Sequence, residues 1–349
     1  MNKHEFIAAT LRGLHHSQAH RLLSPMYSGI GSVLLFHRVL PRSDARTFSP
    51  NARLQVAPEF FEALIEHLLR AQYDLVDMTE VKRRLDGHSG RKFACLTFDD
   101  GYRDNFEHAY SIAQRHSVPF TVYLVSGFVE RIRVMWWLGL ERVLSQESSV
   151  AFEFRGLSHL FDTSDPEKKH RCFRQVGELF TSCNTTEQEA LMDVFQERYA
   201  VDFRAASDEA TLTWTMVHEM ARSGLVEFGA HTVSHYPLRT LSEPEARSEI
   251  AGGAQALAEH VGYPVRHLSY PFGGRAHARS REFRLAAEFG FDTAVTTRHG
   301  NLMRAHRDHC WAIPRLSVNG LYQDLANIDV YLSGASAALA HGLKRVITD

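Results

Sequence analysis

The chain is organised around the stretch Lys92-Phe93-Ala94-Cys95-Leu96-Thr97-Phe98-Asp99-Asp100-Gly101-Tyr102. Residues 93–98 are five apolar side chains and a threonine, which is typical of a short strand buried on both faces. Two adjacent carboxylates, Asp99 and Asp100, follow the strand, and Gly101 allows a sharp turn. Because adjacent carboxylates repel and burial makes ionisation harder, such a pair needs a cation or a proton. A solvated Asp-Gly turn is the simpler alternative.

The composition is that of a folded globular protein. The chain has 349 residues, of which 44% are apolar and 23% charged. The formal charge is −2, with both signs spread along the chain, so we expect no nucleic-acid partner. The four cysteines form no CxxC pair, which indicates reduced thiols rather than disulfides or a zinc knuckle. We find neither a signal-peptide pattern nor an apolar run of roughly 18 residues, and expect a cytoplasmic protein.

Residues 1–30 are predicted to form an N-terminal helical segment. Over residues 3–23, an amphipathic helix would place Ile7, Leu11, Leu14 and Leu22 on one face. We expect this face to pack on the main body of the protein. Peripheral membrane contact through the same helix is the alternative.

Strands and helices alternate from residue 31 onward. Short apolar runs predict strands at 32–36, 73–76, 93–98, 119–125, 226–230, 265–270, 292–296 and 312–318, with helices between most of them. This order predicts an α/β fold with a parallel sheet, and seven or eight strands suit a barrel. An open doubly wound sheet is the alternative. Residues 128–212 interrupt the alternation and are predicted to be a mostly helical insertion in a main domain spanning 31–349.

A second group of polar residues follows a strand in Phe228-Gly229-Ala230-His231-Thr232-Val233-Ser234-His235. If the chain turns or becomes helical after the strand, both imidazoles point the same way. Two imidazoles and one carboxylate form a common zinc ligand set that leaves one position open. Carboxyl ends of parallel strands meet on one face, so this pair is expected near Asp99 and Asp100. With 21 histidines in the chain, a coincidental pair is the alternative.

Two further strand ends carry candidate groups. In His267-Leu268-Ser269-Tyr270-Pro271-Phe272-Gly273-Gly274, the turn after the strand can direct backbone N–H groups at an oxyanion. The segment Val33-Leu34-Leu35-Phe36-His37 ends in a histidine, the usual general acid in proteins. Each feature alone also fits a simple turn or a structural histidine.

Three of these stretches together resemble the polysaccharide deacetylase family, also called the NodB-homology or carbohydrate esterase 4 family. Residues 97–101 match its first motif and residues 231–235 its second, while residues 269–273 look like a variant of its third. The resemblance covers about residues 31–320 apart from the insertion. It implies a distorted (β/α) barrel and a divalent metal, usually Zn²⁺.

The resemblance also implies roles for individual residues. Asp100, His231 and His235 would hold the metal, Asp99 would be the general base, and Phe272 would offer its backbone N–H to the oxyanion. These roles suit the attack of a metal-activated water on an amide carbonyl.

The sequence departs from the family pattern at two places. The family often carries an arginine that orients the base in its third motif, where this chain has Ser269; Arg266 or Arg315 could replace it. The usual C-terminal Leu-x-x-His motif is missing, and some family members resemble circular permutations with this motif at the N-terminus. Residues 34–37 look like it, which makes His37 the expected general acid.

The sequence thus predicts a metal-dependent hydrolase that removes N-acetyl groups from an amino sugar or glycan intermediate in cell-surface polysaccharide biosynthesis. A nucleotide sugar, a lipid-linked intermediate or a growing glycan would be the substrate. Trp136 and Trp137 would either stack on a sugar or anchor packing. One alternative is hydrolysis of a non-sugar amide at the same site, and another is a catalytically silent carbohydrate-binding protein.

Overall fold

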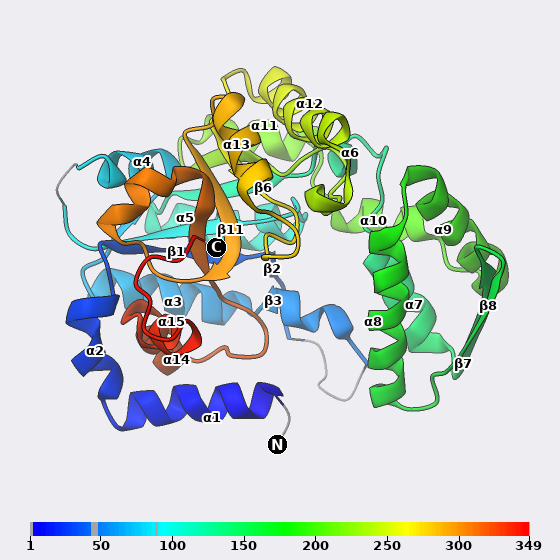
Figure 1. Ribbon diagram of the computed structural model, residues 1–349, viewed down its shortest axis with the longest axis horizontal. Coiled ribbons are helices and arrows are strands. Elements are labelled where there is room, and N and C mark those ends of the chain that lie inside the picture. Colours follow the sequence, from blue (N-terminus) through cyan, green and yellow to red (C-terminus); the bar gives the residue numbers. More distant parts are fainter. Residues whose placement is uncertain (1–2, 43–47, 88–89, 349) are drawn as a thin grey trace. The chain divides into compact units, whose positions relative to one another are not determined.

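The computed structural model describes residues 3–42, 48–87 and 90–348, and its elements divide into two compact units (Figure 1). The first unit comprises Met1–Pro41, Leu54–Ser126 and Leu212–Asp349. The second comprises Arg42–Arg53 and Gly127–Thr211.

In the described part of the first unit, seven parallel strands close into a ring. The order around the ring is β1 (Gly31–Phe36), β12 (Ile313–Ser317), β11 (Thr293–His299), β10 (His267–Ser269), β9 (Val226–Ala230), β6 (Phe120–Leu124) and β5 (Phe93–Phe98), which pairs again with β1. The eighth strand, β4 (Asp74–Val76), pairs with β5 outside the ring. The expected distorted (β/α) barrel is therefore confirmed, and the open doubly wound alternative is wrong.

The distortion arises at β5. Strand β1 pairs with β5 along its whole length, from Gly31 opposite Phe93 to Phe36 opposite Phe98. The other edge of β5 is shared, because β4 pairs with its first three residues and β6 only with its last two. The barrel is thus splayed between β5 and β6 at the amino end of the strands and closed at the carboxyl end.

Alternation along β5 sends neighbouring side chains to opposite sides of the ring wall. Phe98 packs outward in an aromatic cluster with Phe36 and with Phe61 of α3 (Pro58–Arg70), at ring-centroid distances of 5.2 and 5.6 Å. Thr97 lies inside the barrel, where its hydroxyl donates to the Leu34 carbonyl at 2.9 Å. Asp99 follows in the same inward phase, so the pattern of β5 directs it into the mouth of the barrel.

Helices surround the ring and connect its strands. They are α4 (Met78–Leu85), η2 (Asn105–Tyr110), α5 (Ser111–His116), α11 (Trp214–Arg222), η3 (Leu238–Thr240), α12 (Glu243–Val261), α13 (Ser280–Glu288), η4 (Arg304–Ala312), α14 (Leu325–Leu332) and α15 (Ala335–Ala340). A further parallel pair joins β2 (Arg38–Val39) to β3 (Gln55–Val56). Among the described residues, no helix has the length and apolar composition to cross a membrane.

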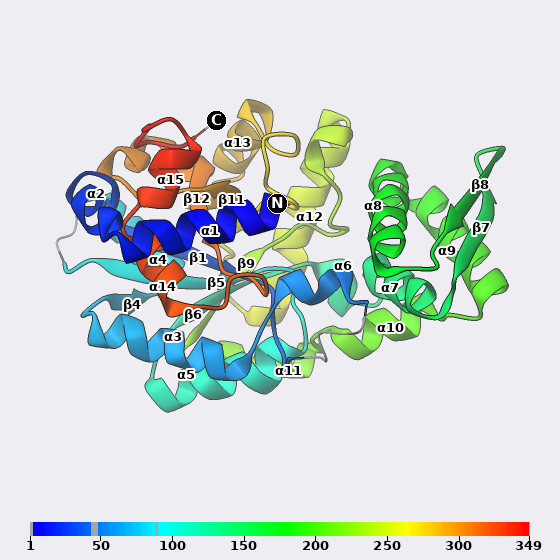
Figure 2. The same cartoon turned by 90° about the horizontal axis from the view of Figure 1, so that it is seen from below.

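The N-terminal segment is two helices, not the predicted single helix over 3–23. Helix α1 (Lys3–His16) ends before Gln18, whose φ of +57° turns the chain into α2 (Ala19–Tyr27). Because the break changes the helical phase, Leu11 is buried whereas Leu22 is 83% exposed. Helix α1 packs against α14 and α2 against α15, so the two ends of the chain lie side by side (Figure 2). The membrane-contact alternative stays a hypothesis.

The second unit contains helices and one hairpin. Its elements are η1 (Pro50–Leu54), α7 (Trp136–Gln146), β7 (Ser149–Phe154), β8 (Leu157–Asp162), α8 (Pro166–Ser182), α9 (Thr185–Tyr199) and α10 (Phe203–Ala210), and α6 (Ser126–Val129) leads into it from β6. The antiparallel pair β7–β8 lies in a region for which the sequence predicts mainly helices. Residues 42–53, which the sequence does not single out, belong to the same unit.

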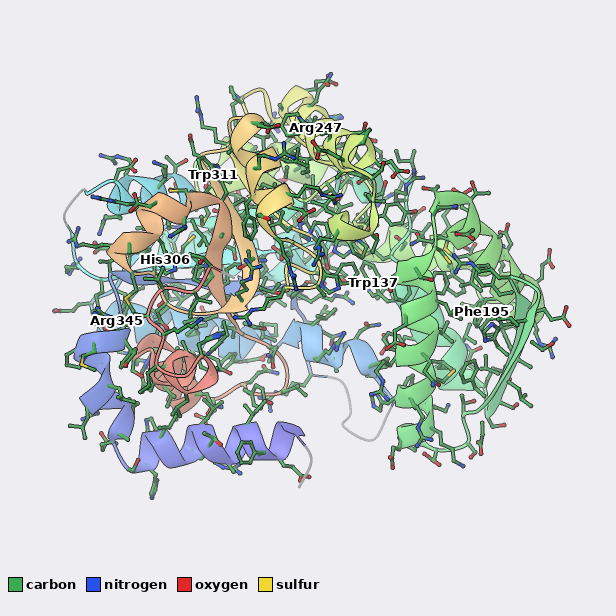
Figure 3. All side chains as sticks on the ribbon, viewed as in Figure 1. Trp137, Phe195, Arg247, His306, Trp311 and Arg345 are labelled. Atoms are coloured by element: carbon green, nitrogen blue, oxygen red, sulfur yellow. The ribbon has the colours of Figure 1, made fainter. Side chains whose placement is uncertain are left out.

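The two adjacent tryptophans are packing residues of this second unit. Trp136 stacks on Phe180 at a ring-centroid distance of 4.6 Å, and Trp137 is only 8% exposed and contacts Phe128. Phe195, labelled in Figure 3, lies in the same apolar cluster. These contacts favour the packing role for both tryptophans, and sugar stacking by the partly buried Trp136 stays a hypothesis.

Candidate active site

Polar residues from several strands meet at the carboxyl ends of the ring, as the parallel barrel requires. Asp99 and Asp100 follow β5, His231 follows β9, and His37 follows β1. Ser269 ends β10, and Arg315 lies within β12.

Asp100, His231 and His235 form a candidate metal centre. Each offers one ligand atom, and these atoms lie within 4.8 Å of one another. Asp100 Oδ1 is 3.5 Å from His231 Nε2 and 3.3 Å from His235 Nε2. The side chains are almost fully buried, with His235 the most exposed at 11%. This is a ligand set that zinc accepts while keeping a position open.

The orientation of His231 supports this reading. Its Nδ1–H donates to the Ser269 carbonyl at 2.7 Å. Since a carbonyl can only accept, the neutral ring has no proton on Nε2 and presents that lone pair toward Asp100. Partners of this kind orient histidines that bind metals. The donor set therefore fits a divalent cation.

Glu249 of α12 holds the loop that carries the two histidines. Thr232 and His235 have φ angles of +66° and +59°, a region that non-glycine residues seldom occupy. The Glu249 carboxylate accepts hydrogen bonds from the N–H groups of Val233 at 3.1 Å and Ser234 at 2.8 Å. These two bonds compensate for the unfavourable backbone and fix where the second histidine points.

Glycine is required at two positions around this centre. A Cβ on Gly253 of α12 would lie 2.6 Å from the Thr232 carbonyl carbon, so only glycine lets the helix approach the histidine loop. Gly101 has a φ of +83°, and a Cβ there would lie 2.4 Å from Leu124 Cδ1. The glycine of the first motif thus turns the chain immediately after Asp100.

Asp99 forms a bidentate ion pair with Arg315 inside the barrel. Arg315 Nη1 donates to Oδ1 at 2.8 Å and Nη2 to Oδ2 at 2.6 Å, and Arg315 is 1% exposed. The Ser269 hydroxyl donates to Asp99 Oδ2 at 3.2 Å and accepts from Arg315 Nη2 at 3.0 Å. Arg315 also donates to the Thr296 carbonyl and the Thr97 hydroxyl. The base candidate therefore accepts three side-chain hydrogen bonds, two from Arg315 and one from Ser269.

The two acids have different electrostatic surroundings. Burial would raise the pKa of Asp99, but Arg315 and His231 lower it below the ordinary aspartate value. Burial likewise opposes ionisation of Asp100, but the neighbouring rings of His235 and His231 hold the pKa of this carboxyl well below its usual range. Both groups are carboxylates near neutral pH, one paired with a permanent cation and the other with titratable rings.

Arg266 does not take the place of the missing third-motif arginine. It directly precedes β10 and so lies at the amino end of that strand, with its side chain 58% exposed and 3.5 Å from Asp292. The next residue, His267, is buried against Glu227 at 3.2 Å. The alternative based on Arg266 is therefore wrong, because the strand separates it from the mouth of the barrel. Arg315 contacts Asp99 instead.

Phe272 lies beside the metal centre in a left-handed turn. Its φ is +61° and its ring centroid is 4.9 Å from that of His235. The Thr297 hydroxyl donates to the Phe272 carbonyl at 2.7 Å, which fixes the peptide. Within the described part of the chain, no group accepts a hydrogen bond from the Phe272 N–H. This donor is available to a ligand.

His37 is held at the mouth through its backbone. Asn105 Nδ2 donates to the His37 carbonyl at 2.8 Å. The neighbouring Asp104 accepts from the Val39 N–H and from Arg38 Nε, both at 2.8 Å. The segment after β1 is thus tied to the loop that follows the acidic pair.

The charges of Asp99 and Asp100 affect the pKa of the His37 ring. Burial lowers its pKa, while the charges of Asp100 and Asp99 act in the opposite direction. A lowered pKa makes the protonated imidazole a stronger acid and also leaves a smaller fraction of it protonated near neutral pH.

Several residues support the site through contacts that the sequence did not predict. They are Asp104, Asn105, Glu249, Gly253, Thr297, and Ser269 in its contact with Asp99. The Asp104-Asn105 pair, four residues after Asp100, is a signal that could have been noted. Glu249 could not be distinguished from the other acids of its helix, because its role depends on which face of α12 meets the histidine loop.

Comparison with known proteins agrees with this geometry. A model of the polysaccharide deacetylase family matches residues 86–294, more than half of the chain. The matched range contains both aspartates and both histidines, whereas His37 and Arg315 lie outside it. A search of curated proteins found no match.

Solved structures of deacetylases share the fold at low sequence identity. The Streptococcus pyogenes deacetylase PplD, in complex with acetate, has a TM-score of 0.55 and 18% identity, over 83% of this chain and 92% of that one. IcaB from Ammonifex degensii has a TM-score of 0.55 and 20% identity, over 87% and 97%. A de-N-acetylase from Aggregatibacter actinomycetemcomitans has a TM-score of 0.53 and 14% identity, over 86% and 99%.

At these identities the solved structures establish the fold alone. The family model in addition matches the range that contains the two motifs with Asp99, Asp100, His231 and His235. The chain belongs to the polysaccharide deacetylase family.

Proposed function

We propose that the chain is a metal-dependent hydrolase that removes N-acetyl groups from an amino sugar or glycan intermediate of cell-surface polysaccharide biosynthesis. Membership in the deacetylase family supports the reaction class. The single observation that carries the proposal is the convergence of Asp100, His231 and His235 within 4.8 Å, beside an Asp99 carboxylate paired with Arg315. This arrangement combines a cation site with a separate base.

A divalent cation, with Zn²⁺ the best fit to these ligands, would supply Lewis acidity toward the acetyl carbonyl and lower the pKa of a bound water. The proposed holders are Asp100, His231 and His235. Hydrogen bonds to Glu249 and to the Ser269 carbonyl support the fit, because they hold both histidines with their ring nitrogens toward Asp100.

The remaining residues are assigned to proton transfer and charge stabilisation. Asp99 is the base that takes the proton of the attacking water, and Arg315 keeps it ionised and oriented. The Phe272 N–H is the donor for the oxyanion of the tetrahedral intermediate. His37 delivers a proton to the amine as the C–N bond breaks, since an unprotonated amine is a poor leaving group.

Two alternatives retain the fold. A hydrolase of a non-sugar amide would use the same residues, and only a substrate comparison separates it from a sugar deacetylase. A catalytically silent carbohydrate-binding protein would not require the acid pair, both histidines and a buried arginine on the base. The retention of these residues favours an enzyme.

We also propose that the enzyme acts in the cytoplasm. The four cysteines are free and buried, as expected of a reducing compartment. Cell fractionation of a tagged chain tests this location, and recovery outside the cytoplasm would contradict it.

The first prediction concerns the reaction. Wild-type protein should release acetate from N-acetylated amino sugars, nucleotide sugars or oligosaccharides, measured with an enzyme-coupled acetate assay. Asp99→Asn should keep the metal and lose roughly 10²–10⁴-fold in turnover, because it removes the proton acceptor and leaves the three proposed metal ligands in place. Acetate release from simple non-sugar acetamides but from no sugar would favour the non-sugar alternative. Metal loss in Asp99→Asn equal to that in Asp100→Asn would contradict the separate roles of the acids.

The second prediction concerns the metal. Purified protein should carry about one transition metal per chain, with ligand distances of about 2.0–2.2 Å to oxygen and nitrogen. His231→Ala and His235→Ala should each lose most of it, as measured by elemental analysis. His16→Ala, which removes an exposed histidine from α1, is the control and should retain it. Full retention of the metal in both His231→Ala and His235→Ala would contradict the assignment of these residues as ligands.

The third prediction concerns the general acid. His37→Ala should retain metal and thermal stability but lose roughly 10²–10⁴-fold in turnover on amide substrates. An ester with a good leaving group needs no such proton, so the variant should lose much less on an acetate ester. Equal losses on amide and ester, or near-normal amide turnover, would rule out this role.

A further inference from the structure

Three exposed arginines lie on the rim of the proposed active site. Arg239 comes four residues after His235, and Arg275 comes three residues after Phe272. Arg279 ends the same loop, directly before α13. We call these three residues the arginine rim. They lie on the continuations of the two loops that carry a metal ligand and the proposed oxyanion donor.

The two loops are joined through the rim itself. Arg239 Nη1 donates to the Arg275 carbonyl at 3.4 Å, and Arg279 Nε donates to the same carbonyl at 2.8 Å. Two guanidinium groups therefore converge on one oxygen atom. Each keeps its other N–H groups available, since a guanidinium has five donors.

Other arginines, on α12 and α13, are paired with acids. Arg247 of α12, labelled in Figure 3, pairs with Glu243 and Glu288, and Arg284 of α13 pairs with the same two acids. The Glu282 carboxylate accepts from Arg281 Nε and from the backbone N–H of Arg279, not from the Arg279 guanidinium. Among the described residues, no carboxylate forms an ion pair with an arginine of the rim. The rim thus holds positive charge that the protein does not neutralise.

A continuous row of side chains links the rim to the metal centre. His235 contacts Phe272, and the Phe272 ring lies 5.2 Å from that of His277. Burial, together with the charge of Arg239, lowers the pKa of His277. The buried Nδ1 of His277 has no hydrogen-bond partner within the described residues. The rings of Phe272 and His277 thus connect the metal centre to the neighbourhood of Arg239.

The arrangement favours an anion as the group bound there. Arginines that lie close together repel one another. The net charge of the chain is −2, so an overall excess of basic residues does not explain the arginine rim. Guanidinium groups match the oxygens of phosphate in bidentate geometry, and several together recognise phosphoryl groups.

We propose that the arginine rim binds the phosphoryl group of a phosphorylated N-acetylated sugar, so that the substrate is a sugar linked to phosphate or diphosphate and not a neutral glycan. This inference rests on the proposed deacetylase function and specifies its substrate. A nucleoside diphosphate sugar and an isoprenoid diphosphate sugar share the chemistry that the rim recognises.

The test compares matched substrates that differ only in the phosphate. Acetate release is measured for an N-acetylated amino sugar 1-phosphate and for the methyl glycoside of the same sugar. Wild-type protein should prefer the phosphorylated sugar by tenfold or more in kcat/KM, and the preference should weaken with added salt. In the double variant Arg239→Gln, Arg279→Gln this ratio should approach one. Arg284→Gln removes a paired arginine of α13 and should keep the wild-type ratio.

Binding of inorganic pyrophosphate, measured by calorimetry after chelation of metal, gives a second readout that needs no turnover. Wild-type protein and Arg284→Gln should bind it, and the double variant should bind at least tenfold more weakly. If no sugar releases acetate while pyrophosphate binding depends on the rim, the proposed reaction fails and the anion site stands. If both sugars are hydrolysed equally and the double variant keeps that ratio, the rim proposal is overturned and the deacetylase stands.

A substrate pair then separates the two sources of the phosphate. A nucleoside diphosphate sugar and a short-chain isoprenoid diphosphate sugar are compared at equal concentration, with kcat/KM as the measure. Dependence on the rim for either one supports the proposal, and the higher value identifies the natural carrier. Preference for a uronate-containing oligosaccharide over both would overturn the phosphate assignment, because carboxylate would then be the recognised anion.

Discussion

The ion pair between Arg315 and Asp99 is the interaction on which the rest of the site depends. An unpaired guanidinium at 1% exposure would be prohibitively costly, and Asp99 supplies the neutralising charge. The same guanidinium bonds to Thr97 of β5, Ser269 of β10 and the Thr296 carbonyl of β11. One buried side chain from β12 therefore links four strands and positions Asp99, the proposed base. Truncation of a buried pair typically costs about 3–5 kcal/mol, so an isosteric change of Asp99 separates catalysis from folding better than a deletion does.

The adjacent aspartates obtain different roles from their partners. Asp99 faces a permanent cation that keeps it ionised, and Asp100 lies within 3.5 Å of the Nε2 atoms of two imidazoles. A strand end turns one residue inward and the next aside, so two neighbours in sequence enter different environments. Paired acids with distinct surroundings are a general basis for dividing a base from a second carboxylate function.

The barrel brings residues from outside the matched range to the same site. Arg315 and His37 lie outside the range that the family model matches, yet both approach the acidic pair. In a closed parallel ring, the carboxyl end of every strand faces the same mouth. A functional side chain can therefore be supplied by a different strand while its place in space is conserved. The Ser269 hydroxyl bonds to both partners of this ion pair, since it donates to Asp99 and accepts from Arg315.

The sequence by itself determined the parts of the protein that depend on local pattern. Apolar runs followed by polar residues located the barrel strands, and the two motifs located Asp99, Asp100, His231 and His235 at strand ends. Only the tertiary structure decided between Arg315 and Arg266, closed the ring through β1 and β5, and placed Glu249 and Gly253 against the histidine loop. The break of the N-terminal helix at Gln18 and the stacking of Trp136 on Phe180 were likewise visible only in the structure. These features follow from contacts between residues distant in sequence or from a single backbone angle, and periodicity carries no information about either.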